Sequence, residues 1–336
     1  MKKIVVGLIV VIVAVAAVGG YLFLKPKASI PPGKVFHVGI LSGLNLFASI
    51  ADSFKAEMTT LGYTEGNNIV YDLQKTNFEP EKEKQILSKF VSDKVDLVVG
   101  WNTEVSLEAK DAIKGTTIPL VFANAFTEGN NLVSSIRAPG NNLTGVRYPN
   151  IDVGIKRLEI MHEIMPNAKR IFVPYQKGYP SALPILEAIR PAAAKLGVTL
   201  VEFPAENVAA LDAELAKRSA SGSLGFDAVV FIPESLSTMK DAFAAIAKYT
   251  RAKKIPIGGS SVATADFATL FAVTVDSVEI GKLAAHLADK IFRGISAGTI
   301  PVVSPETFLI VNNKTATELG ITLSNNILSK ANKVIR

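Results

Sequence analysis

The sequence predicts an α/β protein made of two Rossmann-like lobes with parallel sheets, joined by a multi-crossing hinge and preceded by an N-terminal membrane helix. Three observations predict it. Strand and helix patterns alternate along the chain, this layout occurs twice, and the chain begins with a long apolar run. Alternation of apolar strands with helices is typical of parallel sheets with crossover helices on both faces.

The first 33 residues predict a membrane segment followed by a spacer. Two lysines precede an apolar run from Ile4 to Leu24 that contains no charge, and a Pro-rich stretch, Lys25–Gly33, follows it. About 20 apolar residues are enough to cross a bilayer. The small residues Ala14–Ala16 also suit cleavage of a secretory signal, but the apolar run continues past them, so we favour a retained anchor. We therefore expect an extracytoplasmic domain, in the periplasm or at the cell surface, anchored through residues 4–24.

Composition excludes several classes of function. The chain has 36 Lys+Arg and 30 Asp+Glu, but four of the lysines and none of the acids lie in the first 33 residues, which leaves 32 against 30. Such a balance gives no support to nucleic-acid binding. There is no cysteine, so disulfides, thiolate metal sites and thiol nucleophiles are excluded. The roughly 300 residues beyond Pro32 exceed what one hydrophobic core usually serves, so two lobes are expected.

The first lobe is predicted from four short apolar runs separated by helical patterns. The first helical pattern is stopped by Gly62, and the third apolar run is strongly apolar. In chain order we expect a strand at Val35–Leu41, a helix at Ser49–Leu61, a strand at Ile69–Leu73, a helix at Glu79–Ser92, a strand at Val95–Gly100, a helix at Ser106–Ile113 and a strand at Ile118–Ala123.

The same layout then begins again. The segment Phe226–Val230 echoes Val95–Val99, roughly 130 residues earlier, which indicates a second lobe of similar design. In chain order we expect a helix at Val153–Met165, a strand at Arg170–Pro174, a helix at Ser181–Leu196, a strand at Thr199–Phe203, a helix at Leu211–Ser219, a strand at Ala228–Ile232, a helix at Leu236–Ala252 and a strand at Ile255–Gly258.

The remaining elements predict a hinge. They are placed best if the chain crosses between lobes near Tyr148, near Thr274 and near Pro305. We expect one lobe at 34–147 plus 274–304 and the other at 148–273 plus 305–336. The tail elements are a strand at Leu270–Val275, a helix at Val278–Arg293, a strand at Thr307–Val311, a helix from Lys314 and a short helix at Ile327–Ala331.

The loops that follow the strands are the expected ligand site. In parallel α/β sheets, ligands bind beyond the carboxyl ends of the strands. These loops are rich in amides, hydroxyls and aromatic rings, which suit a small polar ligand. The residues that we expect to line the site are Ser42, Trp101, Asn102, Thr103, Asn124, Ala125, Tyr175, Tyr179, Ser181, Glu234, Ser235 and Ser260.

Several of these residues have a structural interpretation as well. Trp101 can form a stacking wall for a ligand or pack its loop against its own lobe. Tyr175 and Tyr179 can touch the ligand or lie on the surface. Thr103 and Ser181 can cap the helices that follow them, or bind an anion at the helix N-terminus.

No catalytic constellation is present. The three histidines lack metal-ligand spacing, and the chain contains no G-x-S-x-G elbow, no G-x-G-x-x-G after a strand and no Gly-Lys-Ser/Thr phosphate loop. We therefore predict no enzyme, no metal site and no cofactor.

The chain resembles the ABC transporter substrate-binding family, whose characterised members include tryptophan and tyrosine binders. The most specific stretches are the turn L-G-Y-T-E-G-N-N at Leu61–Asn68 and the run P-G-N-N-L-T-G-V at Pro139–Val146, and the likeness extends from about residue 35 to the end. Other similar stretches are Val38–Leu41, Val95–Val99, Ile118–Phe122, Met165–Ile171 and Asn312–Ala331.

This resemblance implies a type I periplasmic-binding-protein fold with three hinge crossings and a ligand closed between the lobes. It implies delivery of a small solute to an ABC permease powered by a separate ATPase, without chemistry on the solute. Family binding positions carry over to Thr103 and Ser181. The family often has His-Pro where this chain has Leu44-Asn45, and Asp-Pro where it has Thr127-Glu128. An aromatic amino acid is consequently one candidate among small polar ligands.

The sequence thus favours the solute-binding component of an ABC importer with a small-molecule ligand, possibly an amino acid, and no nucleic acid. Two alternatives stay open. One is a membrane-tethered sensory ectodomain of the same fold that reports to a signalling partner. The other is a secreted enzyme with an unrecognised site.

Overall fold

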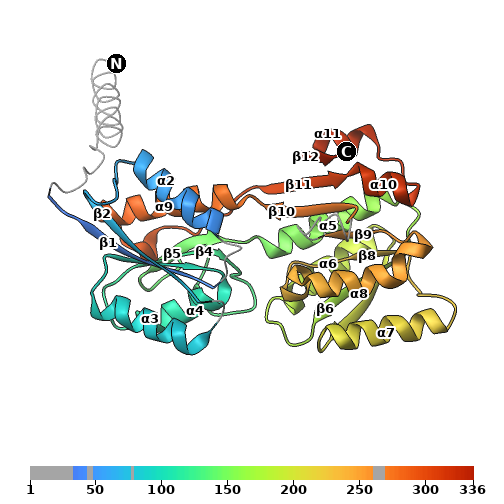
Figure 1. Ribbon diagram of the computed structural model, residues 1–336, viewed down its shortest axis with the longest axis horizontal. Coiled ribbons are helices and arrows are strands. Elements are labelled where there is room, and N and C mark those ends of the chain that lie inside the picture. The colour runs from blue at the N-terminus through green and yellow to red at the C-terminus, as the bar shows by residue number, and fades with distance from the viewer. Residues whose placement is uncertain (1–32, 44–47, 77–78, 260–268) are drawn as a thin grey trace, which may run out of the picture.

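The computed structural model describes residues 33–43, 48–76, 79–259 and 269–336. Two α/β lobes lie side by side, each built around its own sheet (Figure 1). Within these residues no helix is long and apolar enough to span a membrane, and the expected membrane helix at residues 4–24 lies outside them.

The first sheet has the strand order β2-β1-β3-β4-β5, and all of its pairs are parallel. Four of its strands are apolar and largely buried, because helices cover both faces, whereas the edge strand β2 is more polar and mostly part-exposed. They are β1 (Phe36–Ser42), β2 (Ile69–Lys75), β3 (Leu97–Trp101), β4 (Leu120–Ala125) and β5 (Leu143–Arg147).

Helices α2 (Ala48–Thr60) and α9 (Ser277–Phe292) cover one face of this sheet, and α3 (Pro80–Ser92) and α4 (Thr103–Ala112) cover the other. Although α9 comes more than 200 residues after α2, the two helices lie against each other (Figure 1). Gly281 permits this approach, since a Cβ there would lie 2.0 Å from the Ser53 Oγ and 2.4 Å from the Ile50 oxygen.

The second sheet has the order β12-β11-β10-β9-β8-β6-β7. Its strands are β6 (Arg170–Gln176), β7 (Thr199–Ala205), β8 (Ala228–Val230), β9 (Ile257–Gly259), β10 (Phe271–Val275), β11 (Thr307–Asn312) and β12 (Lys333–Ile335). Its covering helices are α5 (Asn150–Ile164), α6 (Ala182–Lys195), α7 (Val208–Ala220), α8 (Lys240–Thr250), α10 (Asn313–Leu319) and α11 (Asn325–Lys330).

Three connections run between the two sheets. Strand β5 leads into α5, and β10 leads into α9, which packs on the first sheet. The chain then pairs Val303 with Val146 beside β5 and enters the second sheet again as β11. Two of these connections are short, since two residues separate β5 from α5 and one residue separates β10 from α9.

The sequence prediction differs from the structure in four places. Strand β11 runs antiparallel to β10, with Val275 opposite Thr307, so the second sheet is not wholly parallel. The reason is that β10 leaves this sheet and the chain returns at the same end. The predicted helix Leu236–Ala252 is divided into a 3-10 turn, Ser235–Thr238, and α8. Strands β5 and β12 were not predicted.

Candidate functional site

The N-terminus of α4 is shaped by an asparagine with an unusual backbone. Asn102 has φ +79°, and its Oδ1 accepts a hydrogen bond from the Val105 N–H at 3.0 Å. Asn therefore caps this helix, because its side chain satisfies a donor that the helix leaves open. The neighbouring Thr103 does not cap it. The Thr103 Oγ1 accepts from the Phe126 N–H at 2.9 Å instead and ties two loops together.

A second asparagine in the left-handed region, Asn124, lies one residue before the end of strand β4. Asn124 has φ +56°, and the pairing of β4 with β5 shifts between Ala123 and Ala125. Strain of this kind is concentrated at binding sites, where the surrounding fold holds it in place. The Asn124 Oδ1 is buried and has no hydrogen-bond partner among the described residues. Ala125 is buried behind it, and its oxygen accepts from the Tyr148 N–H.

In the second lobe, Glu234 is held by one of its two carboxylate oxygens. Its Oε2 accepts from the N–H groups of Gln176 and Leu236, each at 3.1 Å. Ser235 donates to the Gln176 Oε1, which fixes the same loop. The Glu234 side chain is buried, and that burial raises its pKa to about 7, although the backbone donors act in the opposite direction.

The second oxygen of Glu234 and the hydroxyl of Ser181 are both buried. In the described part of the chain neither the Glu234 Oε1 nor the Ser181 Oγ has a hydrogen-bond partner. Ser181 immediately precedes α6, but its side chain makes no capping bond there. The first turn of α6 therefore has no side-chain cap from Ser181.

The two lobes touch each other next to these residues. The Tyr179 hydroxyl donates to the Glu104 Oε1 at 3.1 Å, and the Tyr179 ring meets Phe126 edge-on with centroids 6.3 Å apart. A Cβ on Gly129 would lie 2.3 Å from the Pro180 oxygen. Burial, together with nearby Glu104 and Glu234, raises the pKa of Tyr179 above its ordinary value. Tyr179 is thus close to charged groups from both lobes.

Tyr148 and Asn150 lie where β5 passes into α5. The Tyr148 ring meets Phe126 edge-on at 5.7 Å. The Asn150 Oδ1 accepts from the Ile151 N–H at 3.0 Å, which leaves the Asn150 Nδ2 as the free end of a buried amide. Sequence reasoning missed both residues as site residues because they belong to a crossing, not to a loop after a strand.

Arg157 on α5 was also missed. Its side chain is buried, its Nε donates to the Val273 oxygen at 3.1 Å, and its Nη1 donates to the Phe231 oxygen at 2.9 Å. Burial lowers the pKa of Arg157, while Tyr148 and Glu234 raise it. This guanidinium ties α5 to the middle of β10 and to the residue that follows β8.

Five polar atoms around this junction share one property. Each is buried, and among the residues that the structure describes each lacks a hydrogen-bond partner; they are Asn102 Nδ2, Asn124 Oδ1, Asn150 Nδ2, Ser181 Oγ and Glu234 Oε1. Leaving one such group unsatisfied costs roughly 1–3 kcal/mol, and native proteins leave few of them. Their loops are connected through Phe126, Tyr148 and Tyr179. The donors and acceptors of this cluster match those that a small polar ligand carries.

Comparison with known proteins identifies the chain. The sequence profile described as "ABC transporter substrate binding protein" matches residues 40–335. The chain belongs to this family. Its members bind solutes and are not enzymes, and they work outside the cytoplasm. The resemblance and the absence of an enzymatic function that were expected from the sequence are thereby confirmed.

Relatives of this substrate-binding protein include binders of aromatic amino acids. A tyrosine-binding protein of Clostridioides difficile (strain R20291) is 28% identical over 262 residues, which cover 77% of this chain and 73% of that protein. A conserved domain protein from Vibrio cholerae has a TM-score of 0.74 at 26% identity, over 90% of this chain and all of that one. A domain from Streptococcus pneumoniae in complex with L-Trp has a TM-score of 0.76 at 23% identity, over 90% and 100%.

Four other residues of this substrate-binding protein were expected to line the site, and the structure describes three of them. Trp101 is fully buried in the first lobe and meets Phe54 edge-on at 5.9 Å, and its Nε1 has no partner in the described residues. Ser42 is buried at the end of β1. Tyr175 is half-buried next to Glu202, and Ser260 lies outside the described residues.

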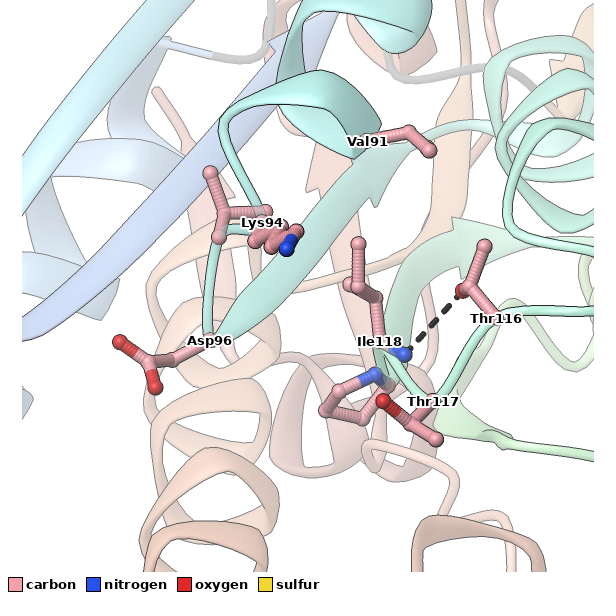
Figure 2. Close-up of a pocket in the computed structure, with 8 residues that line it drawn as sticks. Val91, Lys94, Asp96, Thr116, Thr117 and Ile118 are labelled. Carbon is pink, nitrogen blue, oxygen red and sulfur yellow. Dashed lines mark hydrogen bonds between the residues drawn. The ribbon is translucent and has the colours of Figure 1, made fainter.

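A pocket of about 540 Å³ lies at the opposite edge of the first sheet of the protein, where β3 and β4 begin (Figure 2). Asp96, at its rim, pairs with Lys34 at 2.7 Å and accepts from the His37 N–H. Because ligands of parallel sheets bind at the carboxyl ends of strands, this pocket is separate from the candidate site. It is lined by Val91, Lys94, Val95, Asp96, Thr116, Thr117, Ile118 and Pro119.

Proposed function

We propose that this protein is the solute-binding component of an ABC importer. It captures a small polar or amino-acid-like ligand between its two lobes and delivers it, chemically unchanged, to a permease that a separate ATPase powers. Membership of the family supports this proposal, and the arrangement of polar groups between the lobes supports the mode of capture.

One observation carries the mode of capture, namely the buried and unpartnered polar atoms on both sides of the lobe junction. Asn102 and Asn124 belong to the first lobe, and Ser181 and Glu234 belong to the second. A ligand that pairs with all four must contact both lobes at once. Such a ligand binds the closed arrangement better than an open one, and this difference in affinity drives closure.

The choice of ligand class has support from the relatives and from the aromatic rings at the junction. One relative binds tyrosine and one similar structure holds L-Trp. Tyr148 and Tyr179 each meet the Phe126 ring edge-on, and such edge-on pairs also form with the flat ring of an aromatic ligand. Glu128 lies at a position where the family often has Asp-Pro in place of Thr127-Glu128. Its carboxylate is already paired with Arg147 at 2.6 Å. We therefore assign Glu128 no direct role in binding.

The same proposal includes a membrane anchor and two moving lobes. The apolar run at residues 4–24 holds the protein at the outer face of the membrane, near its permease, and the segment 34–147 plus 274–304 and the segment 148–273 plus 305–336 act as the two moving lobes. Fractionation of cells that produce the full chain tests the anchor. Recovery in the membrane fraction is expected, and full release into the soluble fraction would contradict it.

Identification of the natural ligand tests the proposed function. The full-length chain is purified in mild detergent, any ligand that copurifies is identified by mass spectrometry after unfolding, and its affinity is measured by calorimetry. Recovery of one small solute in unchanged form is expected, together with loss of its uptake in cells that lack this protein. Turnover of the solute, or unchanged uptake in those cells, would overturn the proposal.

A further inference from the structure

We propose that Arg157 is the positioning residue of the hinge. The chain crosses between the lobes three times, from β5 to α5, from β10 to α9 and from α9 to β11. The Arg157 guanidinium joins the first crossing to the other two, so that all three bend together when the lobes close. Arg157 acts through the backbone and not on the ligand. The inference rests on the proposed function, because it concerns how the lobes close on a solute, and it extends that function to a residue of the hinge.

Arg157 is a buried charge without a close counter-ion. It lies on α5 with only 2% of its surface exposed. Within the residues that the structure describes, no carboxylate oxygen lies within 4.0 Å of its guanidinium. Burying an unpaired charge is costly, and an apolar side chain of similar size would avoid that cost. Packing therefore does not account for an arginine at this position.

The guanidinium donates to two backbone oxygens at the place where β9 ends. Strand β9 lies between β8 and β10, and it stops at Gly259, opposite Ala272 of β10. Phe231 directly follows β8, and Val273 is the next residue along β10. The Arg157 Nη1 donates to the Phe231 oxygen at 2.9 Å, and its Nε donates to the Val273 oxygen at 3.1 Å. Arg157 therefore bridges the two outer strands beyond the end of β9.

The site suits arginine better than lysine. The planar fork of an arginine holds several N–H donors in fixed directions, whereas a lysine carries one compact ammonium group. Gly259 leaves room for the fork, since a Cβ there would lie 3.3 Å from the Arg157 Cδ and 2.6 Å from the Phe231 oxygen. This glycine keeps both the arginine stem and one of the oxygens that it binds clear of side chains.

The two bonds connect the three crossings on the side of the second lobe. Helix α5, which carries Arg157, directly continues the first crossing. Strand β10 leads into the second crossing, and its last residue, Val275, pairs with Thr307 at the start of β11, where the third crossing ends. Strand pairing thus joins the second and third crossings to each other. Arg157 joins the first crossing to this pair.

Closure then bends the chain between this unit and the first lobe. The connecting residues are 148–149, 276 and 304–306, which lie outside the helices and strands. The backbone of Tyr148 is held by the first lobe, because its N–H donates to the Ala125 oxygen at 2.9 Å. Without the Arg157 bonds, the end of β10 would keep β11 as its only neighbouring strand and could move independently of α5. The ligand-free protein would then sample more lobe separations, and closure would cost more entropy.

Single-molecule energy transfer on the full chain in mild detergent tests the proposal. The chain has no cysteine, so Ser92→Cys in α3 and Ala216→Cys in α7, both at exposed positions, place one dye on each lobe. Arg157→Lys keeps the charge and loses the fork. It is expected to widen the distribution of lobe separations without ligand. By calorimetry, the dissociation constant of the copurified solute should rise about 5- to 30-fold, as expected if closure must order one more backbone residue.

Arg218→Lys is the matched control. Arg218 lies on α7 in the same lobe and also donates to a backbone oxygen, that of Leu224 at 3.2 Å, but it belongs to no crossing. This variant should leave the distribution of lobe separations and the dissociation constant unchanged, even where it lowers thermal stability. If Arg157 had a purely structural role, Arg157→Lys would behave in the same way. A folded Arg157→Lys with unaltered width and unaltered affinity would therefore overturn the proposal.

Experimental structures of the unaltered protein with and without its copurified solute give a second test, which no folding defect affects. Both Arg157 bonds are expected in both structures, with changes in backbone torsion confined to 148–149, 276 and 304–306. Loss of either bond on closure would overturn the proposal and leave the receptor function standing. If no solute copurifies and uptake is unchanged in cells that lack the protein, the proposed function falls. The width of the ligand-free distribution then still decides the role of Arg157.

Discussion

The contact between Gly129 and Pro180 offers a way to oppose lobe closure without touching the ligand. Gly129 lies in the first lobe with φ +76°, and Pro180 lies in the second. A Cβ at position 129 would lie 2.3 Å from the Pro180 oxygen and 3.0 Å from its carbonyl carbon. In Gly129→Ala the lobes must therefore separate locally before the methyl group fits. We expect this substitution to disfavour the closed arrangement and so to weaken ligand binding.

The expected change in the dissociation constant of Gly129→Ala depends on two free-energy costs, one of backbone strain and one of overpacking. Left-handed backbone costs an alanine about 1–2 kcal/mol, but this cost is present in open and closed forms alike and cancels from the closure equilibrium. Overpacking costs about 1–3 kcal/mol and applies only when Pro180 is in place. The dissociation constant is therefore expected to rise by roughly 5- to 150-fold.

Calorimetry with the copurified ligand measures this change, and small-angle scattering reports whether the ligand still compacts the protein. Gly66→Ala is the matched control, because Gly66 has φ +83° but has no atom within 4 Å of the added Cβ. It should lower stability and leave affinity unchanged. Equal affinity of Gly129→Ala and the unaltered protein would refute the argument, since the two lobes would then not meet at this point in the bound form.

Three further outcomes are expected. Tyr179→Phe removes the hydrogen bond to Glu104 across the lobes and should raise the dissociation constant roughly 2- to 10-fold by calorimetry; an unchanged constant would contradict a role in closure. Gly281→Ala places a methyl group 2.0 Å from a side-chain oxygen of α2, and should lower the free energy of unfolding in urea by about 1–3 kcal/mol; an unaltered midpoint would count against the close packing of α2 and α9. Burial, and then Glu83, raise the pKa of Glu108 to about 7. Between about pH 5 and 7 the folded chain therefore keeps a proton on Glu108 that the unfolded chain has lost. The free energy of unfolding accordingly falls as the pH rises from about 5 through 7. Glu108→Gln should therefore flatten the loss of thermal stability over that range, and a slope equal to that of the unaltered protein would show that another group titrates.

Most of the fold could be predicted because apolar runs and helical patterns alternate clearly. Strand β5 escaped prediction because Thr144 and Gly145 interrupt its apolar character, and Gly145 is required there by the close approach of Phe122. Strand β12 has only three residues, which is too short for a periodic signal. The antiparallel direction of β11 depends on a crossing between lobes that no local pattern encodes.

The candidate site could be predicted in part for a similar reason. Loops after strands are found from the strands themselves, and they contain Asn102 and Glu234, while Asn124 lies one residue before the end of β4. Sequence alone could not tell that Asn102 caps α4 in place of Thr103, because either residue type caps helices well. The roles of Asn150 and Arg157 depend on where a helix from one crossing lies against the ends of other strands, which is tertiary information.

An experimental structure of the protein with its copurified ligand tests the central claim most directly. That claim is that one small solute contacts both lobes through their buried polar groups. The ligand is expected within hydrogen-bonding distance of the Glu234 Oε1 on one side and of the Asn102 Nδ2 on the other. A ligand bound to one lobe alone, or in the pocket near Lys94 and Thr116, would contradict capture between the lobes.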